Sequence, residues 1–170
     1  DEFDIIVKGK GGHAASPHLA IDPVVISAQV ISAVQTIISR STDPVDKALI
    51  SITKINAGTA YNVIDDQVTM GGTIRTFKKE TRSYIEKRLG ELCKGIAEAH
   101  GAEIKIQFDL VNKYPPTINS KKESIFASNV AKDLVGEDKV ITDIDPSMGG
   151  EDFSYLLEEK PGTYLYLGQG

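Results

Sequence analysis

The amino-acid sequence predicts an α+β fold. Its first part is expected to be a ferredoxin-like β-α-β-β-α-β unit, a four-stranded antiparallel sheet with two helices on one face, and an incomplete α/β segment follows. Two observations predict this order: strand-like and helix-like hydrophobic periods alternate as far as residue 110, and Tyr114-Pro115-Pro116 then interrupts them. A hydrophobic content of 41% in 170 residues is enough for a packed core.

The first strand and the first helix are read from residues 3–39. Residues 3–8 (FDIIVK) predict a strand. Asp22 suits an N-cap and Pro23 suits the first helical position. Apolar residues then recur at helical spacing, and no charged residue occurs before Arg40. Such a helix is either buried inside its own domain or also meets a second subunit.

The remaining elements of the first unit follow in order. Residues 48–58 and 68–77 predict two strands, and a Gly71-Gly72 pair in the second indicates a bulge or a close backbone approach. Residues 79–101 predict a helix with Ile85, Leu89, Leu92 and Ile96 on one face, Cys93 in the core and Gly101 at the end. Residues 103–110 alternate between polar and apolar and predict the fourth strand, with Ile104, Ile106, Phe108 and Leu110 on one face.

Beyond the proline pair the sequence predicts a helix at 121–135, a short strand at 140–143, a helix over EDFSYLLEE and a strand at 163–168. Glu151 and Asp152 are expected in the first turn of the second of these helices, where the helix dipole favours carboxylates. These last residues, about 55 in number, are too few for a good core. We therefore expect them to be part of a second domain, with the domains at 1–115 and 116–170.

Composition limits the possible partners. The net charge of −5 is spread along the chain without a basic block, which argues against nucleic acid. The apolar stretch at 24–39 contains Ser, Gln and Thr, so we expect no membrane span. The single cysteine excludes an internal disulfide and is compatible with a reducing, cytoplasmic location. The chain begins at Asp1 rather than Met, which suggests a piece of a longer protein.

His13 is the first residue with possible chemistry, in GKGGHAASPHLAIDP (9–23). An imidazole can donate to an anionic oxygen, accept a proton or bind a metal, and small neighbours would let a substrate approach. The nearby candidates are only His18 and Asp22, and the spacing to His18 fits neither one helix face nor one strand face, so we expect no metal site at His13. On these residues alone, an exposed loop histidine is the favoured interpretation, and His18 and His100 have no supporting context.

Three further positions are open in the same way. Asn62, between two strands, could bind a ligand or stabilise a turn. Arg75 lies next to Ile74, so if Ile74 faces the helices, Arg75 faces the other side of the sheet. There it could be a surface residue, or its planar guanidinium could bind a carboxylate. Glu151 follows Gly149-Gly150 and could serve only the helix N-terminus.

Taken in order, GKGGHAASPHLAIDP, AGTAYNVIDDQVTMGGTIRTF and PSMGGEDFSYLL resemble the zinc-dependent amidohydrolases and exopeptidases, the family of aminoacylases, hippurate hydrolases, indoleacetyl-amino-acid hydrolases and carboxypeptidase G. The resemblance covers essentially the whole chain. It implies that residues 1–115 are an inserted lid or dimerisation domain and that residues 116–170 return to a catalytic domain. It also implies a homodimer formed through the lid.

The resemblance assigns roles by position. His13 would reach the partner's active site and stabilise the oxyanion, Asn62 and Arg75 would bind the substrate, and Gly149, Gly150 and Glu151 would line the pocket. The reaction implied is hydrolysis of the amide of N-acyl amino acids or related small amides. It would use divalent metal, zinc as one ion or two, and neither the metal ligands nor the general base match residues of this chain, so the chain alone should be inactive. The alternative is a non-catalytic ferredoxin-like module that binds a ligand or only dimerises.

Overall fold

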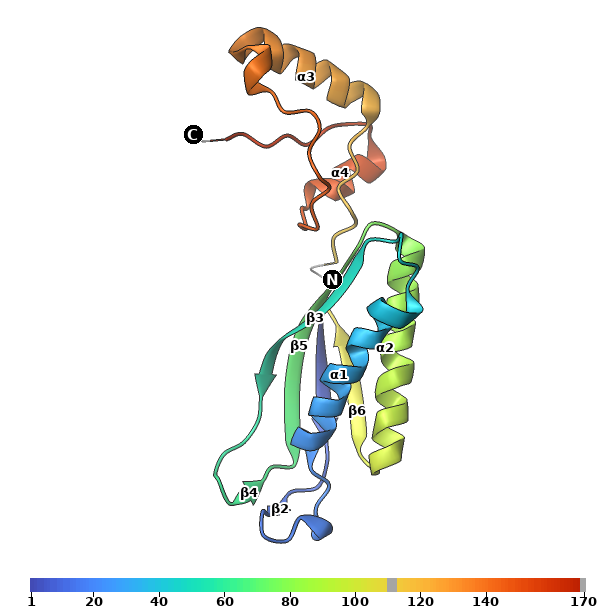
Figure 1. Cartoon of the computed structure of the whole chain (residues 1–170), viewed down its shortest axis with the longest axis vertical. Helices are drawn as coiled ribbons and strands as arrows, with labels where there is room; N and C mark the ends of the chain where they lie inside the picture. Colours follow the sequence, from blue (N-terminus) through green and yellow to red (C-terminus); the bar gives the residue numbers. More distant parts are fainter. Residues whose placement is uncertain (110–112, 169–170) are drawn as a thin grey trace. The chain divides into compact units, whose positions relative to one another are not determined.

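The computed structural model describes residues 1–109 and 113–168, and it divides the chain into two compact units, Asp1–Lys113 and Tyr114–Gly170 (Figure 1). We call them the sheet unit and the C-terminal unit.

The sheet unit contains one four-stranded antiparallel sheet. Its strands are β1 (Glu2–Lys8), β3 (Ala48–Asn56), β5 (Gln67–Thr76) and β6 (Glu103–Phe108), in the order β3-β5-β1-β6. The first and third strands of the predicted motif are therefore central and the second and fourth are edges, which is the ferredoxin-like arrangement and confirms the predicted fold class. The predicted Leu110 lies outside the described residues.

Two helices, α1 (Pro23–Ser41) and α2 (Lys79–His100), cover one face of this sheet (Figure 1). The start of α1 is fixed by the carboxylate of Asp22, which accepts hydrogen bonds from the backbone N–H groups of Val24 and Val25. The end of α2 is fixed by Gly101, whose φ of 67° lies in the left-handed region. Both helix boundaries follow the capping signals in the sequence.

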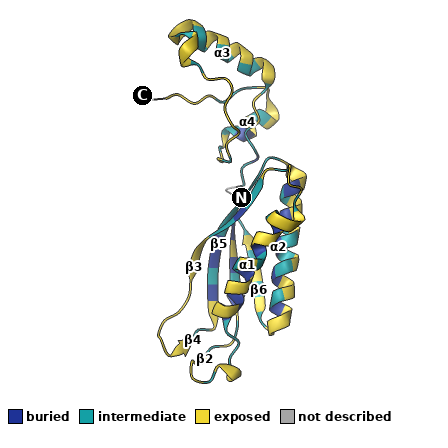
Figure 2. Ribbon diagram, in the orientation of Figure 1, coloured by how far each residue is buried: buried dark blue, intermediate teal, exposed yellow. Residues whose placement is uncertain are grey.

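The core lies between the sheet and the two helices, and Figure 2 shows it as the buried residues on the facing surfaces. Every second residue of β1 and β5 contributes to it, as the alternation predicts. The fully buried members from the helices and the central strands are Ile5, Val7, Ile26, Val30, Val34, Ile37, Val68, Met70, Ile74, Ile85, Leu89 and Cys93. Cys93 is therefore a core residue, as its position in the helical pattern predicts.

Helix α1, whose one charged residue is Arg40, is by length and composition apolar enough to cross a membrane, a test that buried core helices also pass. One of its faces packs into the core through Ile26, Val30, Val34 and Ile37. Val24 and Val25 at its start are exposed, whereas Ile31 and Ile38 are half-buried against the core. The apolar surface of α1 is thus wider than its own domain covers.

Gly72 allows β5 to approach its neighbours closely. A Cβ placed there would lie 2.6 Å from the ring of Phe3 on β1 and would collide with the carbonyl oxygen of Ser51 on β3. Beside it, the β3–β5 register shifts between Ile52 and Lys54. The predicted bulge and the predicted close approach therefore both occur at the glycine pair.

Among the described residues of the C-terminal unit, all regular secondary structure is helical. It contains α3 (Lys121–Val135), a short 3₁₀ turn (Glu137–Lys139) and α4 (Phe153–Glu159). The prediction of strands at 140–143 and 163–168 is wrong, since the described residues there form no β-strand pairing. A strand needs a neighbour for its backbone groups, and the described part of this unit provides only isolated hydrogen bonds, such as Ser120 N–H to the Gly162 carbonyl oxygen at 2.9 Å.

We expect Gly72→Ala to lower the free energy of unfolding of the 170-residue chain by about 1–3 kcal/mol, because the added methyl group overpacks the sheet. Urea unfolding followed by circular dichroism measures it. The matched control is Gly90→Ala in α2, where an added Cβ meets nothing within 4 Å. That change should stabilise the chain by about 0.5–1 kcal/mol through helix propensity. Equal effects of the two substitutions would contradict the close approach at Gly72.

Candidate functional site

His13 lies in a small two-stranded sheet at one end of the sheet unit. The strands β2 (Gly12–His13) and β4 (Val63–Ile64) pair antiparallel, with His13 opposite Val63. Two backbone hydrogen bonds extend this pairing, from Ala14 N–H to the Asn62 carbonyl oxygen at 3.0 Å and from Gly9 N–H to the Asp66 carbonyl oxygen at 2.8 Å. A Cβ at Gly11 would lie 2.9 Å from the Ile64 carbonyl oxygen, so the glycines of the motif allow the two segments to meet.

The ring of His13 is fixed in one tautomer by its own loop. The backbone N–H of Ala15 donates a hydrogen bond to Nδ1 at 3.1 Å. A neutral imidazole whose Nδ1 accepts must carry its proton on Nε2. His13 is exposed, so Nε2–H is a donor that a bound ligand can use.

Asn62 belongs to the same end of the sheet unit. Its backbone carbonyl accepts from the Ala14 N–H beside His13, and a hydrogen bond from Thr59 Oγ1 to Asp65 Oδ1 at 2.8 Å closes the loop that contains it. Asn62 itself is exposed, and its neighbour Tyr61 is fully exposed. The structure therefore brings His13 and Asn62 together, although they are far apart in sequence.

Arg75 lies at the opposite end of the sheet. It is next to the last residue of β5, whereas Asn62 precedes the first residue, Gln67. At the rise of an extended strand, Arg75 is about 26 Å from Gln67. One copy of the chain thus does not place Arg75 in the same site as His13 and Asn62.

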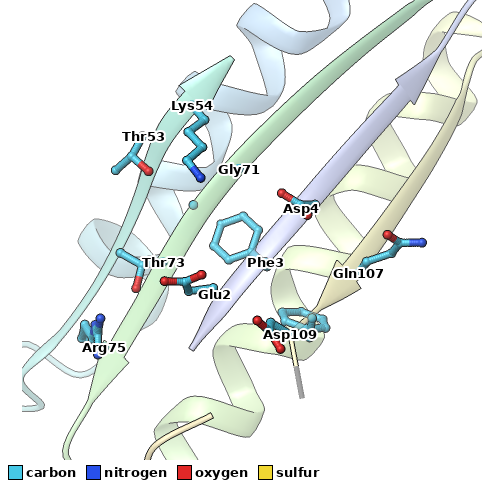
Figure 3. Close-up of a pocket in the computed structure, with 12 residues that line it drawn as sticks. Glu2, Phe3, Asp4, Thr53, Lys54, Gly71, Thr73, Arg75, Gln107 and Asp109 are labelled. Atoms are coloured by element: carbon cyan, nitrogen blue, oxygen red, sulfur yellow. The ribbon is translucent and has the colours of Figure 1, made fainter. Parts of the chain in front are cut away.

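The side chain of Arg75 faces the open side of the sheet. Its neighbour Ile74 is buried in the core on the helix side, so the alternation predicted for this pair is confirmed. Figure 3 shows Arg75 beside Thr73 and Glu2 on that open face. The residues around it form a shallow depression of about 510 Å³ that carries both charge signs, with Asp4 and Lys54 also on its lining.

The glycine loop of the C-terminal unit precedes α4. Gly149 and Gly150 are exposed, and the Gly149 N–H donates to Ser147 Oγ at 3.2 Å. The expectation that Glu151 and Asp152 lie in the first helical turn is wrong, because α4 begins at Phe153 and Asp152 makes no side-chain cap. Backbone carbonyl groups instead accept the hydrogen bonds of the N–H groups at the start of α4, since Ser154 N–H donates to the Glu151 carbonyl oxygen at 3.2 Å.

The carboxylate of Glu151 has two hydrogen-bonding neighbours. Asp152 lies against it and can donate to it as the protonated acid, and the hydroxyl of Tyr164 donates to Oε2 at 3.0 Å. The contact with Asp152 has the largest effect and the bond from Tyr164 the next largest, and together they hold the pKa of Glu151 below its ordinary value. The bond to Glu151 in turn raises the pKa of Tyr164. Glu151 is therefore held in its ionised form, in which it only accepts hydrogen bonds.

Other reactive side chains are structural in the described part of the chain. Burial raises the pKa of the Cys93 thiol to about 11, so it is not a nucleophile at neutral pH. His100 Nε2 lies 2.8 Å from Gln29 Oε1 and links the two helices. Within residues 1–109 and 113–168, no three His, Cys, Asp or Glu side chains lie close enough together to hold a metal ion.

The fold and these residues define an α+β domain that carries two groups of polar residues at opposite ends of one sheet. A family model described as a peptidase dimerisation domain matches residues 1–101, more than half of the chain. The chain belongs to the M20 peptidase family, in which this domain occurs.

Relatives match nearly the whole chain. It is 40% identical over 167 residues to a hippurate hydrolase of Campylobacter jejuni, covering 98% of this chain and 43% of the relative. It is 37% identical over 168 residues to an N-acetylcysteine deacetylase of Bacillus subtilis, covering 99% and 43%. The chain thus spans less than half the length of these curated relatives.

Solved structures have the same fold. A putative aminohydrolase from methicillin-resistant Staphylococcus aureus superposes with a TM-score of 0.78 at 29% identity, over 95% of this chain and 41% of that one. The YXEP protein of Bacillus subtilis, described as a dinuclear metal binding peptidase of the M20 family, superposes with a TM-score of 0.68 at 33% identity, over 95% and 38%.

We expect neutral His13 to be almost entirely the Nε2–H tautomer, because the Ala15 N–H occupies Nδ1. Long-range ¹H–¹⁵N NMR spectra of the chain at pH 9 measure the tautomer from the two ring nitrogen shifts. His18 is the matched control, since it is exposed in the neighbouring 3₁₀ turn and no described residue contacts its ring by a hydrogen bond. A predominant Nδ1–H form of His13 would show that the loop does not orient the ring.

Proposed function

We propose that this chain is the dimerisation domain and an adjoining catalytic-domain segment of a metal-dependent amidohydrolase that cleaves the amide bond of N-acyl amino acids. The relatives named for hippurate and N-acetylcysteine support this substrate class. The observation that carries the proposal is the distance between the two polar groups. His13 and Asn62 stand at one end of β5 and Arg75 at the other, so a second copy is needed to complete a site.

The edge strand β3 supports pairing of two copies. It runs from Ala48, opposite Thr76, to Asn56, opposite Thr69, so its two ends lie beside the two polar groups. Antiparallel pairing of β3 with β3 of a second copy about a twofold axis would put the His13 end of one copy beside the Arg75 end of the other. The exposed apolar surface of α1 and a groove between α1 and β3, lined by Ile38 and Leu49, fit the same interface.

The proposed roles follow from the donors available. Nε2–H of His13 would donate to the oxyanion that forms when water attacks the amide. A donor placed at that developing charge lowers the activation free energy by about 3 kcal/mol. The amide of Asn62 would assist it. The planar guanidinium of Arg75 would bind the substrate carboxylate through two parallel hydrogen bonds. Gly149, Gly150 and Glu151 would line the pocket.

The divalent metal of such a reaction, zinc in this proposal, would be bound outside the described residues of this chain. When bound, it would supply an activated water. The division between the sheet unit and the C-terminal unit at Lys113 supports the assignment of 1–115 as lid and 116–170 as part of the catalytic domain. Exposed apolar side chains of the C-terminal unit, among them Phe126 and Leu134, support its belonging to a larger domain.

The chain completed at both ends with the flanking segments of the hippurate hydrolase should hydrolyse N-acyl amino acids and lose this activity with a chelator. Release of the free amino acid measures it, and added Zn²⁺ should restore it. The uncompleted chain, which should be inactive, is the control. A completed protein that forms dimers but cleaves no N-acyl amino acid and binds no divalent metal would favour the non-catalytic dimerisation module instead.

In that completed enzyme, His13→Ala and Arg75→Ala should each lower kcat/KM by about 10²-fold or more, with metal content unchanged. Mixing the two inactive variants should recover about a quarter of the original activity. Half of the randomly formed dimers combine both variants, and one of the two sites in each of these is then intact. Dimers are measured by sedimentation. Mixed dimers that form without any recovery would show that His13 and Arg75 act in the same copy.

A further inference from the structure

Tyr164 lies in a segment that follows α4 and is held in place by a single side chain. The amide of Asn119 accepts from the Tyr164 N–H at 2.7 Å and donates to the Tyr164 carbonyl oxygen at 3.0 Å. One side chain thus satisfies both backbone groups of Tyr164, in the way a neighbouring strand would. The backbone position of Tyr164 is therefore fixed although the segment forms no β-strand.

The ring of Tyr164 is fixed as well. It packs against Phe153 of α4 with ring centroids 5.6 Å apart, and Tyr166 lies edge-on at 5.4 Å. With the backbone and the ring held, the hydroxyl has little freedom, and it donates to Oε2 of Glu151 at 3.0 Å. Tyr164 comes after α4 and Glu151 before it, so this bond connects the two ends of that short helix.

We infer that Tyr164 is a positioning residue, oriented by Asn119, that holds the carboxylate of Glu151 in one place and in its ionised form for substrate binding. This inference rests on the proposed function, in which Glu151 lines the pocket. An ionised carboxylate with a fixed oxygen is an acceptor for an N–H group, which an N-acyl amino acid offers on its amide nitrogen. No other side chain of the described residues bonds to Glu151 except Asp152, which lies beside it.

The hydroxyl of Tyr164 has a measurable effect on Glu151. A hydrogen bond donated to a carboxylate stabilises its charged form and lowers its pKa, the direction found for Glu151. Asp152 contributes to the same shift, so it must stay unchanged in the comparison. Removing the Tyr164 hydroxyl should therefore raise the pKa of Glu151. Removing the hydroxyl of Tyr166, which packs edge-on against Tyr164, should change the pKa of Glu151 little.

The first test measures Glu151 directly in the 170-residue chain. A ¹³C NMR titration of its side-chain carboxyl carbon should show a pKa about half a pH unit or more higher in Tyr164→Phe than in the unchanged chain. Tyr166→Phe is the matched control, because it removes the hydroxyl of an exposed tyrosine two residues after Tyr164. It should leave the pKa of Glu151 unchanged. Equal pKa values in the two variants overturn the inference.

The second test uses the enzyme completed with the hippurate hydrolase flanks. Tyr164→Phe should lower kcat/KM about fivefold, and Tyr166→Phe by less than about 1.5-fold. In a Glu151→Gln background, Tyr164→Phe should add no further loss, because its effect passes through the carboxylate. A similar further loss in that background overturns the inference. An inactive starting enzyme would instead contradict the proposed function, and the NMR titration would still decide the role of Tyr164.

Discussion

The apolar layer between the sheet and its two helices determines the position of every other part of the sheet unit. Ile5 and Val7 of β1, with Val68 and Met70 of β5, form the sheet side of this layer and are completely buried. Because side chains alternate along a strand, burying one set forces the next residues onto the open face. Arg75 faces outward for that reason, since Ile74 beside it is part of the layer.

Most of the sheet unit could be predicted from the sequence because local signals and burial agree there. Asp22, Pro23 and Gly101 mark helix ends through backbone geometry, and these signals need no tertiary information. The C-terminal unit was harder, because its apolar segments at 140–143 and 163–168 resemble strands but find no ladder partner among the described residues. Propensity alone does not make a strand when its backbone has no neighbour.

The candidate site could be predicted only in part. The motifs indicated His13, Asn62, Arg75 and the glycine loop, but their spacing in sequence could not show that the first two lie together and the third far away. The tautomer of His13 depends on a single backbone N–H at Ala15. The bond between Tyr164 and Glu151 joins residues on either side of a helix, and no periodicity or composition indicates such a contact. Distances of this kind are set by packing and not by local sequence.

The two edges of the sheet differ in a way that limits how many copies could join. Strand β6 exposes Glu103, Lys105 and Gln107 between half-buried apolar residues, and charged side chains along an edge discourage the addition of another strand. The last four residues of strand β3 are exposed, and Leu49 and Ile50 near its start line the groove with α1. A domain with one receptive edge and one protected edge closes after a single pairing, whereas two receptive edges would add molecules without end and build an open-ended polymer.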